Sequence, residues 1–428
     1  MSVASDYFAR VRPLLGDGLS KHVVEVEGDA EVALLVVELL ASCMLEHVVG
    51  SDRFAEHHAW KRPFAPLRTS RAPADIRIVA RRGPPSIAWT RGTVTMTADP
   101  SDVLAHVDVS YHVARTIRDA LLGGGAWSSP RQPFDPRGVP IALGHVMVIG
   151  CGSLGSEAIR MLAPGTSRFT LVDDATVTVY NLARQWFGAE DVGRAKVDAL
   201  QDRLEVARTW RTRLEAPDLP ALESLLREDP PDVVLLATGT HHHAMLAELL
   251  WRLGIAHVAA CCYPRARYFE VSVIAPRERT PCLQCFRGHL YRGPAEPIPD
   301  EVASFLYEPV PDATRAQRYT DLVAEPASQI ETLRAAHVLA RCAAELASPD
   351  RSPWFARVLA ESTTCLIGGN ASGSYGITQR GQVIRLGLDD IAGSTDDIHC
   401  DVCARTMRVA LREDAAPVLD ELADAAFL

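Results

Sequence analysis

Three glycines in this chain have the spacing of a phosphate-binding turn. Gly150, Gly152 and Gly155 form the pattern GxGxxG, directly after an apolar run and at the start of a predicted helix. Glycines at these positions allow a tight turn and let backbone N–H groups approach phosphates at the positive N-terminal end of the helix. Asp173 stands where the next predicted strand ends, and an acid at that place contacts ribose hydroxyls. Together the four residues predict a nucleotide site.

Two cationic residues favour a triphosphate over a dinucleotide as the ligand. Arg184 lies in the run Asn-Leu-Ala-Arg-Gln at 181–185, and Lys196 ends the run Gly-Arg-Ala-Lys at 193–196. Arginine and lysine neutralise phosphates and hold them in place. A nicotinamide pyrophosphate does not need these two cations. An NAD-dependent oxidoreductase would therefore account for the glycine loop alone, and we keep it as an alternative.

Four of the ten cysteines form two CxxC pairs, Cys282 with Cys285 and Cys400 with Cys403. Four thiolates at this spacing make a tetrahedral structural zinc site, which has no open position for catalysis. Because the two pairs are far apart in the sequence, zinc would tie the C-terminal tail back to the main domain. The alternative is a set of free, buried cysteines in a reducing cytosol. Both interpretations predict a cytoplasmic protein.

Two further cysteines, Cys261 and Cys262, end an apolar run near the predicted site. They are the nearest candidates for a thiol that accepts an activated acyl group, but buried cysteines on strands usually serve as small apolar packing residues.

Three consecutive histidines, 241–243, open a predicted helix. Since consecutive helical residues fan out around the axis, the three cannot bind one metal, and we interpret them as polar residues of a first helical turn.

The elements that must position these residues follow from the apolar periodicity. After residue 140, predicted strands and helices alternate, which implies a parallel sheet with helices on both faces. A stretch rich in Gly, Pro and Ser precedes it and predicts a linker. Before the linker, a helix over 28–50, half-buried strands over 74–80 and 86–98, and a helix over 102–122 predict a small unit.

The predicted fold class is therefore α/β, with a Rossmann-like doubly wound sheet, a zinc-tied C-terminal extension and a small N-terminal α/β domain. The expected boundaries are 1–122 for the small domain, 123–140 for the linker and 141–428 for the nucleotide-binding domain.

The bulk composition excludes several classes of protein. A hydrophobic fraction of 47% and a charged fraction of 23% are ordinary for a globular protein. The net charge of −10 argues against nucleic acid as a partner. Glu38 and Glu46 interrupt the most apolar stretch, so we expect a buried helix there and no membrane span. The first residues lack a basic stretch followed by a long apolar run, so no signal peptide is predicted.

From about Ala142 to Cys403 the chain resembles the ThiF/MoeB-like activating enzymes, which include the ubiquitin-activating enzymes. Their pattern is a glycine-rich loop, an acid ending the next strand, an Asn-Leu-x-Arg-Gln run and a Gly-x-x-Lys, and all of these parts occur here together with the paired cysteines. The resemblance implies roles for five residues: Asp173 would bind the ribose, Gln185 would support the loop, and the phosphates would be lined by Asn181, Arg184 and Lys196.

The resemblance also implies an activity. The protein would be an ATP-dependent adenylyltransferase that uses magnesium and activates the C-terminal carboxylate of a ubiquitin-like protein or a peptide. The activated acyl group would pass to a thiol, an amine or a sulfur donor. Family members commonly act as homodimers, and a conjugating or peptide-modifying enzyme would be a further partner.

One departure from the family pattern concerns magnesium. Gly239 follows the third predicted strand where the family usually has an acid that helps to hold the ion. Magnesium would then need Asp173, Asp174 or the phosphates alone. A second hypothesis follows, in which the chain is a catalytically impaired scaffold or peptide-binding partner. The N-terminal domain also has two interpretations, a reduced, inactive adenylation-like domain or a module that docks the substrate.

Overall fold

The fold was analysed in a computed structural model. It describes residues 18–43, 45, 47–50, 73–90, 92–123, 141–178, 181–182, 184–238, 240–262, 268–278, 280–285, 329–360, 363–369, 383–387, 396–399, 402–403 and 406–409. Two residues of the sequence-based hypotheses, Gly239 and Cys400, lie outside the described residues, as do the side chains of His241 and His242.

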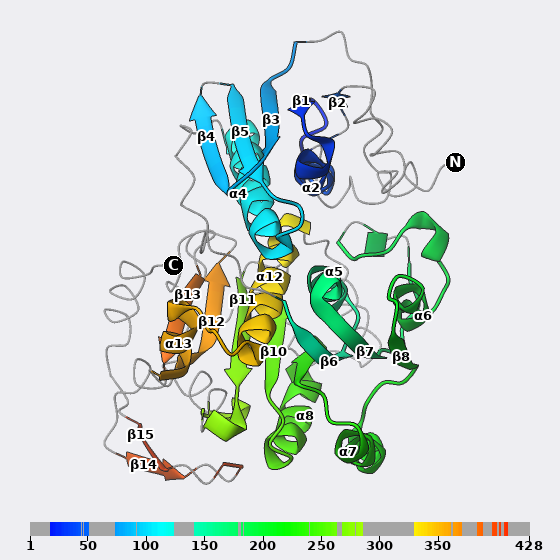
Figure 1. The fold of residues 1–428 in the computed structure, drawn as a ribbon, viewed down its shortest axis with the longest axis vertical. Coiled ribbons are helices and arrows are strands. Elements are labelled where there is room, and N and C mark those ends of the chain that lie inside the picture. Colours follow the sequence, from blue (N-terminus) through cyan, green and yellow to red (C-terminus); the bar gives the residue numbers. More distant parts are fainter. Residues whose placement is uncertain are drawn as a thin grey trace, which may run out of the picture.

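An eight-stranded sheet has the order β13-β12-β11-β10-β9-β6-β7-β8 within the described residues (Figure 1). We call this sheet, together with the helices that cover it, the larger unit. The strands are β6 (Leu143–Ile149), β7 (Thr166–Val172), β8 (Ala207–Trp210), β9 (Val233–Leu236), β10 (His257–Cys262), β11 (Tyr268–Ile274), β12 (Thr363–Gly369) and β13 (Val383–Gly387). Strands β6 to β10 are parallel, whereas β11, β12 and β13 are antiparallel to their neighbours. The order of the parallel strands reverses between β6 and β9, and in such sheets ligands bind where the order reverses.

Helices cover both faces of this sheet, and the alternation along β6 shows why. Val146 and Val148 point into one apolar core with helices α5, α6 and α12, whereas Met147 and Ile149 point into a second core with α7 and α8. Apolar residues on both faces are typical of a strand buried between two helical layers. The helices are α5 (Ser153–Leu162), α6 (Lys196–Gln201), α7 (Leu219–Glu228), α8 (Thr240–Arg252), α12 (Gln329–Ala347) and α13 (Pro353–Ala360). The predicted Rossmann-like fold class is confirmed.

A second, five-stranded sheet lies in the N-terminal part, with the order β2-β1-β3-β5-β4. Only β4 is antiparallel to its neighbour among these strands. The elements are β1 (Val23–Gly28), α2 (Ala30–Ala41), β2 (His47–Gly50), β3 (Ile76–Arg82), β4 (Ser86–Thr90), β5 (Thr93–Ala98) and α4 (Val103–Gly123). We call this group, from β1 to α4, the N-terminal unit.

The helix expected over 28–50 is too long, and this prediction is wrong at its C-terminal end. Helix α2 ends at Ala41, where the hydroxyl of Ser42 donates a hydrogen bond to the carbonyl of Leu39 at 2.6 Å. Residues 47–50 form β2, parallel to β1. The run is apolar throughout, so its periodicity could not separate the helix from a short buried strand.

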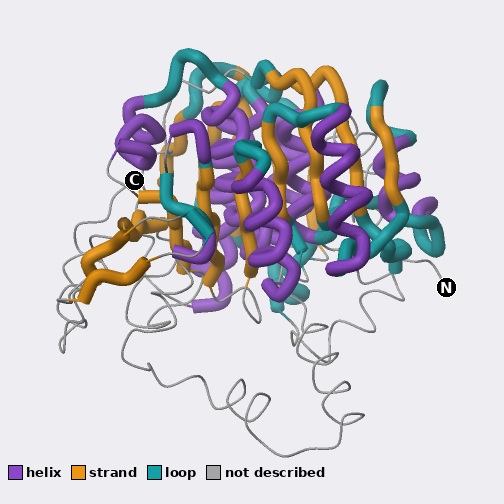
Figure 2. Tube along the Cα trace, turned by 90° about the horizontal axis from the view of Figure 1, so that it is seen from below, coloured by secondary structure: helices purple, strands orange, loops and turns teal. Residues whose placement is uncertain are grey.

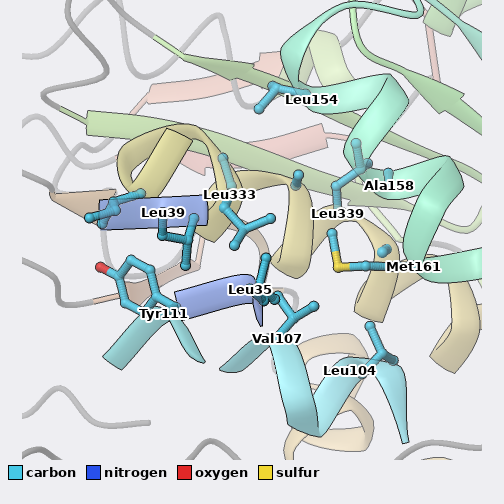
Figure 3. Packing of buried hydrophobic residues seen from close by; sticks show 14 of the residues in the cluster. Leu35, Leu39, Leu104, Val107, Tyr111, Leu154, Ala158, Met161, Leu333 and Leu339 are labelled. Atoms are coloured by element: carbon cyan, nitrogen blue, oxygen red, sulfur yellow. The ribbon is translucent and has the colours of Figure 1, made fainter. Parts of the chain in front are cut away.

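Helix α12 joins the two units. It packs on α5 and β10 of the larger unit and on α2 and α4 of the N-terminal unit. In Figure 3, Leu35, Leu39 and Val107 of the N-terminal unit lie beside Leu333 and Leu339 of α12. The apolar core is therefore continuous between the two units, and Figure 2 shows the helices packed along the strands.

A small hairpin follows the large sheet. Strand β14 (Asp396–His399) pairs antiparallel with β15 (Thr406–Val409). Across the described residues, no helix has the length and apolar character to cross a membrane.

Candidate nucleotide site

The glycine loop turns tightly where β6 ends. Gly150 has a φ of +95°, and a Cβ there would lie 2.6 Å from the carbonyl oxygen of Ala237, which follows β9. A Cβ on Gly155 would lie 1.9 Å from the carbonyl oxygen of Gly150. Only glycine fits these two positions, because the backbone of one strand or helix touches another there.

Helix α5 begins directly after this turn, and Gly152 at its N-cap provides no side-chain cap. A Cβ on Gly152 would meet nothing within 4 Å, so the space in front of the helix is open. The first N–H groups of a helix have no intrahelical partners and carry partial positive charge. An uncapped helix N-terminus beside open space is suited to bind phosphate.

Asp173 follows β7 and is held by the backbone on both of its carboxylate oxygens. The N–H of Cys151 donates to Oδ2 at 2.7 Å, and the N–H of Ala175 donates to Oδ1 at 2.8 Å. The carboxylate is partly exposed and fixed against the glycine loop. Each carboxylate oxygen can accept more than one hydrogen bond, so ribose hydroxyls can still be bound. The ribose role of Asp173 stays a prediction.

Lys196 is brought to the same place by a short antiparallel pairing. The segments 175–178 and 193–196 pair through a bridge between Thr176 and Ala195, and the N–H of Lys196 donates to the carbonyl of Ala175 at 3.0 Å. Complete burial raises the pKa of the Cys151 thiol, the charge of Asp173 raises it further, and the charge of Lys196 lowers it. The ammonium group therefore acts electrostatically on the glycine loop.

The Asn-Leu-Ala-Arg-Gln segment packs against the first turns of α5. The N–H of Trp186 donates to the hydroxyl of Ser156 on α5 at 3.1 Å. Asn181 closes the start of the segment, since its Oδ1 accepts from the N–H of Thr178 at 2.8 Å. Gln185 is buried and Arg184 is half-buried. The structure thus places this segment against α5 and Lys196 beside the segment that follows Asp173. The roles of Asn181, Arg184, Gln185 and Lys196 toward phosphate stay predictions.

A buried acid that the sequence analysis did not identify organises the stretch between these segments. Asp191 is 1% exposed and accepts hydrogen bonds from the N–H of Gly188 at 2.8 Å and from the guanidinium of Arg203 at 2.5 Å. Arg194 lies 3.3 Å from its other oxygen. A single aspartate in a loop has no sequence signature of its own, so only the fold reveals this role.

Two acids near the site have partners within the protein. Asp174 pairs with Arg213 at 3.2 Å, and Asp173 accepts from two backbone N–H groups. Among the described residues, three or more potential metal ligands come together only at the cysteines. Magnesium is commonly held by one or two carboxylates and by phosphates, so Asp173, Asp174 and the phosphates stay the candidates.

Three of the four predicted zinc ligands come together. The sulfur of Cys285 lies 3.7 Å from that of Cys282 and 3.5 Å from that of Cys403. A tetrahedron of sulfurs about 2.3 Å from zinc has edges of about 3.8 Å, which is close to these separations. The neighbouring thiol of Cys282, burial and the charge of Cys403 raise the pKa of Cys285, so a nearby cation would be needed to stabilise a thiolate there. The donor set fits a structural metal.

Cys261 and Cys262 end β10, as expected, and belong to the sheet. Cys261 is 7% exposed and pairs in register with Glu270 of β11, while Cys262 is partly exposed. A catalytic role for Cys261 or Cys262 stays a prediction.

His243 is buried on α8, in the first turn of the helix as expected.

Residues 140–369 match the model of the ThiF family. The match covers more than half of the 428 residues. The chain belongs to the ThiF family.

Solved structures resemble the chain more distantly. E. coli MccB with MccA-N7isoASN is 16% identical, with 60% of this chain and 67% of that chain covered and a TM-score of 0.39. E. coli MccB with ATP is 14% identical, with 58% and 65% covered and a TM-score of 0.38. PaaA is 16% identical, with 57% and 64% covered and a TM-score of 0.37. The chain thus spans about two thirds of the length of these proteins. A comparison with curated proteins found no match.

Proposed function

We propose that the protein uses ATP to adenylate the C-terminal carboxylate of a peptide or a ubiquitin-like protein. The observation that carries the proposal is the uncapped N-terminus of α5, with open space in front of Gly152 and with Asp173 and Lys196 held at its edge. Membership of the ThiF family supports the same function.

The chemistry follows from this arrangement. The phosphates of ATP lie on the N-terminus of α5, and the ribose hydroxyls contact Asp173. A carboxylate oxygen of the substrate attacks the α-phosphorus, and the bond from that phosphorus to the bridging oxygen breaks. Pyrophosphate leaves with the electron pair, and an acyl-adenylate remains. The rate enhancement comes from positioning of the reacting groups and from neutralisation of phosphate charge by Arg184 and Lys196. A magnesium ion, when bound, would neutralise further phosphate charge.

The cysteine cluster has a structural role in this proposal. Cys282, Cys285 and Cys403 would hold zinc and tie the segment around Cys403 to the segment after β11. Cys400 would be the fourth ligand by the CxxC spacing. The acyl acceptor is a thiol, an amine or a sulfur donor on a conjugating or peptide-modifying enzyme. The homodimer expected from the family resemblance stays a prediction.

ATP–pyrophosphate exchange tests the proposal. The protein is incubated with ATP, labelled pyrophosphate and peptides that end in glycine, and label is expected to enter ATP with at least one peptide. Substituting Lys196 or Arg184 by alanine is expected to reduce the rate of exchange by about a hundredfold or more. Each substitution removes a positive charge that would neutralise the phosphates in the transition state. The matched control is Arg211→Ala, since Arg211 is an exposed arginine paired with Asp198 on α6.

Two outcomes would contradict the proposal. Absence of exchange together with absence of ATP binding would favour the scaffold hypothesis. Tighter binding of NAD than of ATP would favour the oxidoreductase. An equal loss of exchange in Arg211→Ala would show that the effect is not specific to the site.

A further inference from the structure

Ser156 of α5 is fully buried beside the glycine loop, and its hydroxyl contacts two separate parts of the site. The hydroxyl donates to the carbonyl of Gly152 at 2.7 Å and accepts from the N–H of Trp186 at 3.1 Å. Because a serine hydroxyl has one proton and two lone pairs, it can make both hydrogen bonds at once. A single oxygen therefore joins the glycine loop to the segment that follows Arg184.

The first of these hydrogen bonds fixes a peptide group at the N-terminus of α5. The carbonyl of Gly152 also accepts from the N–H of Ser156 at 2.9 Å, so two donors hold it. Since a peptide group is planar, a fixed carbonyl on Gly152 also fixes the direction of the N–H of Ser153, the first residue of the helix. This N–H is one of those that have no intrahelical partner and are suited to phosphate.

The second hydrogen bond fixes the backbone that leads to Arg184. Leu182 and Phe187, on either side of Arg184, are buried in the apolar core and anchor the segment. Apolar contacts are not directional, so they hold the segment on the core without setting the path of its backbone. The hydrogen bond from Trp186 to Ser156 is directional, and it sets this path with respect to α5.

The indole of Trp186 is held as well. The guanidinium of Arg203 lies over its ring, 5.8 Å from the centroid, and donates to the buried carboxylate of Asp191 at 2.5 Å. Asp191 in turn accepts from the N–H of Gly188 at 2.8 Å. Trp186 is thus fixed at its backbone by α5 and at its ring by Arg203, two residues after Arg184.

A purely structural role for such a hydroxyl has a counterpart elsewhere in the chain. Serine and threonine in helices often donate to the carbonyl four residues earlier, and Thr116 on α4 does so toward His112 at 2.8 Å. The oxygen of Ser156 makes this bond and in addition accepts an N–H from a segment 30 positions away. The second contact links two parts of the site that the proposed function assigns to phosphate.

We propose that Ser156 is a positioning residue for adenylation, which holds Arg184 against the phosphates through the N–H of Trp186. The inference rests on the proposed function, in which Arg184 neutralises phosphate charge. Ser156 itself contacts neither ATP nor the reacting atoms. Without its hydroxyl, the segment of Arg184 moves with respect to α5, whereas Lys196 keeps its place because the pairing of 175–178 with 193–196 holds it.

A double-mutant cycle in the ATP–pyrophosphate exchange assay separates this role from a structural one. Ser156→Ala is expected to lower kcat for exchange by about tenfold or more, because a small displacement of a group that acts on the transition state is costly. In the Arg184→Ala background the same substitution should change kcat by less than about twofold, since the group it positions is gone. In the Lys196→Ala background the full loss should remain.

The control is Thr116→Val, which removes a hydroxyl with the same bond to the carbonyl four residues earlier and should leave kcat unchanged. An equal loss of kcat in Thr116→Val would show that the effect of Ser156→Ala arises from helix stability. An equal loss from Ser156→Ala in the presence and absence of Arg184, or no loss at all, would also overturn the proposal.

Two measurements distinguish failure of this inference from failure of the proposed function. Without ATP, the amide of Trp186 should exchange its hydrogen about tenfold faster in Ser156→Ala than in the unsubstituted protein. An unchanged rate in the folded variant would overturn the inference whatever the activity. If no peptide supports pyrophosphate exchange, the cycle is read in the ATP affinity measured by calorimetry, where Ser156→Ala should weaken binding only while Arg184 is present. Absence of exchange would then count against the proposed function alone, whereas independent losses of ATP affinity would overturn the positioning by Ser156.

Discussion

Three glycines allow backbone strain, steric contact and ligand contact to be measured separately. Gly193 has a φ of +90° and open space around its Cβ position. Gly193→Ala should therefore lower the free energy of unfolding through backbone strain alone, by about 1–3 kcal/mol. Gly150 has the same kind of backbone, and its added Cβ would meet the backbone of Ala237 and Thr238 at 2.6–2.9 Å. Overpacking adds about 1–3 kcal/mol, so Gly150→Ala should cost about 2–6 kcal/mol in total.

Gly152→Ala should cost almost no stability. Its φ is −82° and a Cβ would meet nothing within 4 Å. The methyl group would instead stand between the helix N-terminus and the phosphates, so ATP binding should weaken by about tenfold or more, which is about 1.4 kcal/mol.

Urea unfolding of the three variants, with ATP binding measured by calorimetry, checks this order. The free energy of unfolding should fall in the order Gly152→Ala, Gly193→Ala, Gly150→Ala. If Gly152→Ala lost as much stability as Gly150→Ala, or kept full ATP affinity, the assignment of the open space to phosphate would be refuted.

Three further predictions concern the metal, the cap of α2 and the buried histidines. Metal analysis should find one equivalent of zinc per chain, and Cys403→Ser should release it and lower the Tm, whereas Cys262→Ser should keep the metal. Asp29 caps α2 by accepting from the N–H groups of Glu31 and Val32. Asp29→Ala should lower the free energy of unfolding by about 1 kcal/mol through loss of this cap, and retention of full stability in urea would contradict these contacts. Burial lowers the pKa of His257 to about 4 and that of His337 to about 3. The unfolded chain takes up these protons below about pH 6.5, so stability is fully present above that pH and falls by up to about 1.4 kcal/mol per pH unit for each histidine as the pH drops toward the folded pKa. His337→Gln should flatten this slope between about pH 6.5 and pH 4, and an unchanged slope would show that His337 is not held neutral.

The Rossmann-like unit with its glycine loop could be predicted because its signals are local. The glycines of 150–155 must turn between one strand and one helix, and apolar periodicity marks the neighbouring elements. The two CxxC pairs also predicted the cluster of Cys282, Cys285 and Cys403. This prediction came from the spacing within each pair, although 118 positions separate Cys285 from Cys403.

The sheet of the N-terminal unit could not be predicted in full, because it depends on pairing between distant strands. Strands β1 and β2 are short, and β2 continues an apolar run that resembles a helix until it pairs with β1. Gly28 gives no GxGxxG pattern, since Ala30 and Ala33 stand at the places of the second and third glycines. Only the fold shows its positive φ and its close approach to the backbone of Ala80 on β3. Buried Asp191 escaped prediction for the same reason.

Transfer of oxygen from the substrate to AMP tests the central claim most directly. A peptide whose C-terminal carboxylate carries ¹⁸O is incubated with the protein, ATP and an amine or thiol acceptor. The masses of the AMP and the pyrophosphate that form are then measured by mass spectrometry. If the carboxylate attacks the α-phosphorus and the acceptor then attacks the acyl carbon, AMP carries one ¹⁸O atom and the pyrophosphate none. Unlabelled AMP, or ADP with label in inorganic phosphate, would contradict adenylation at this site.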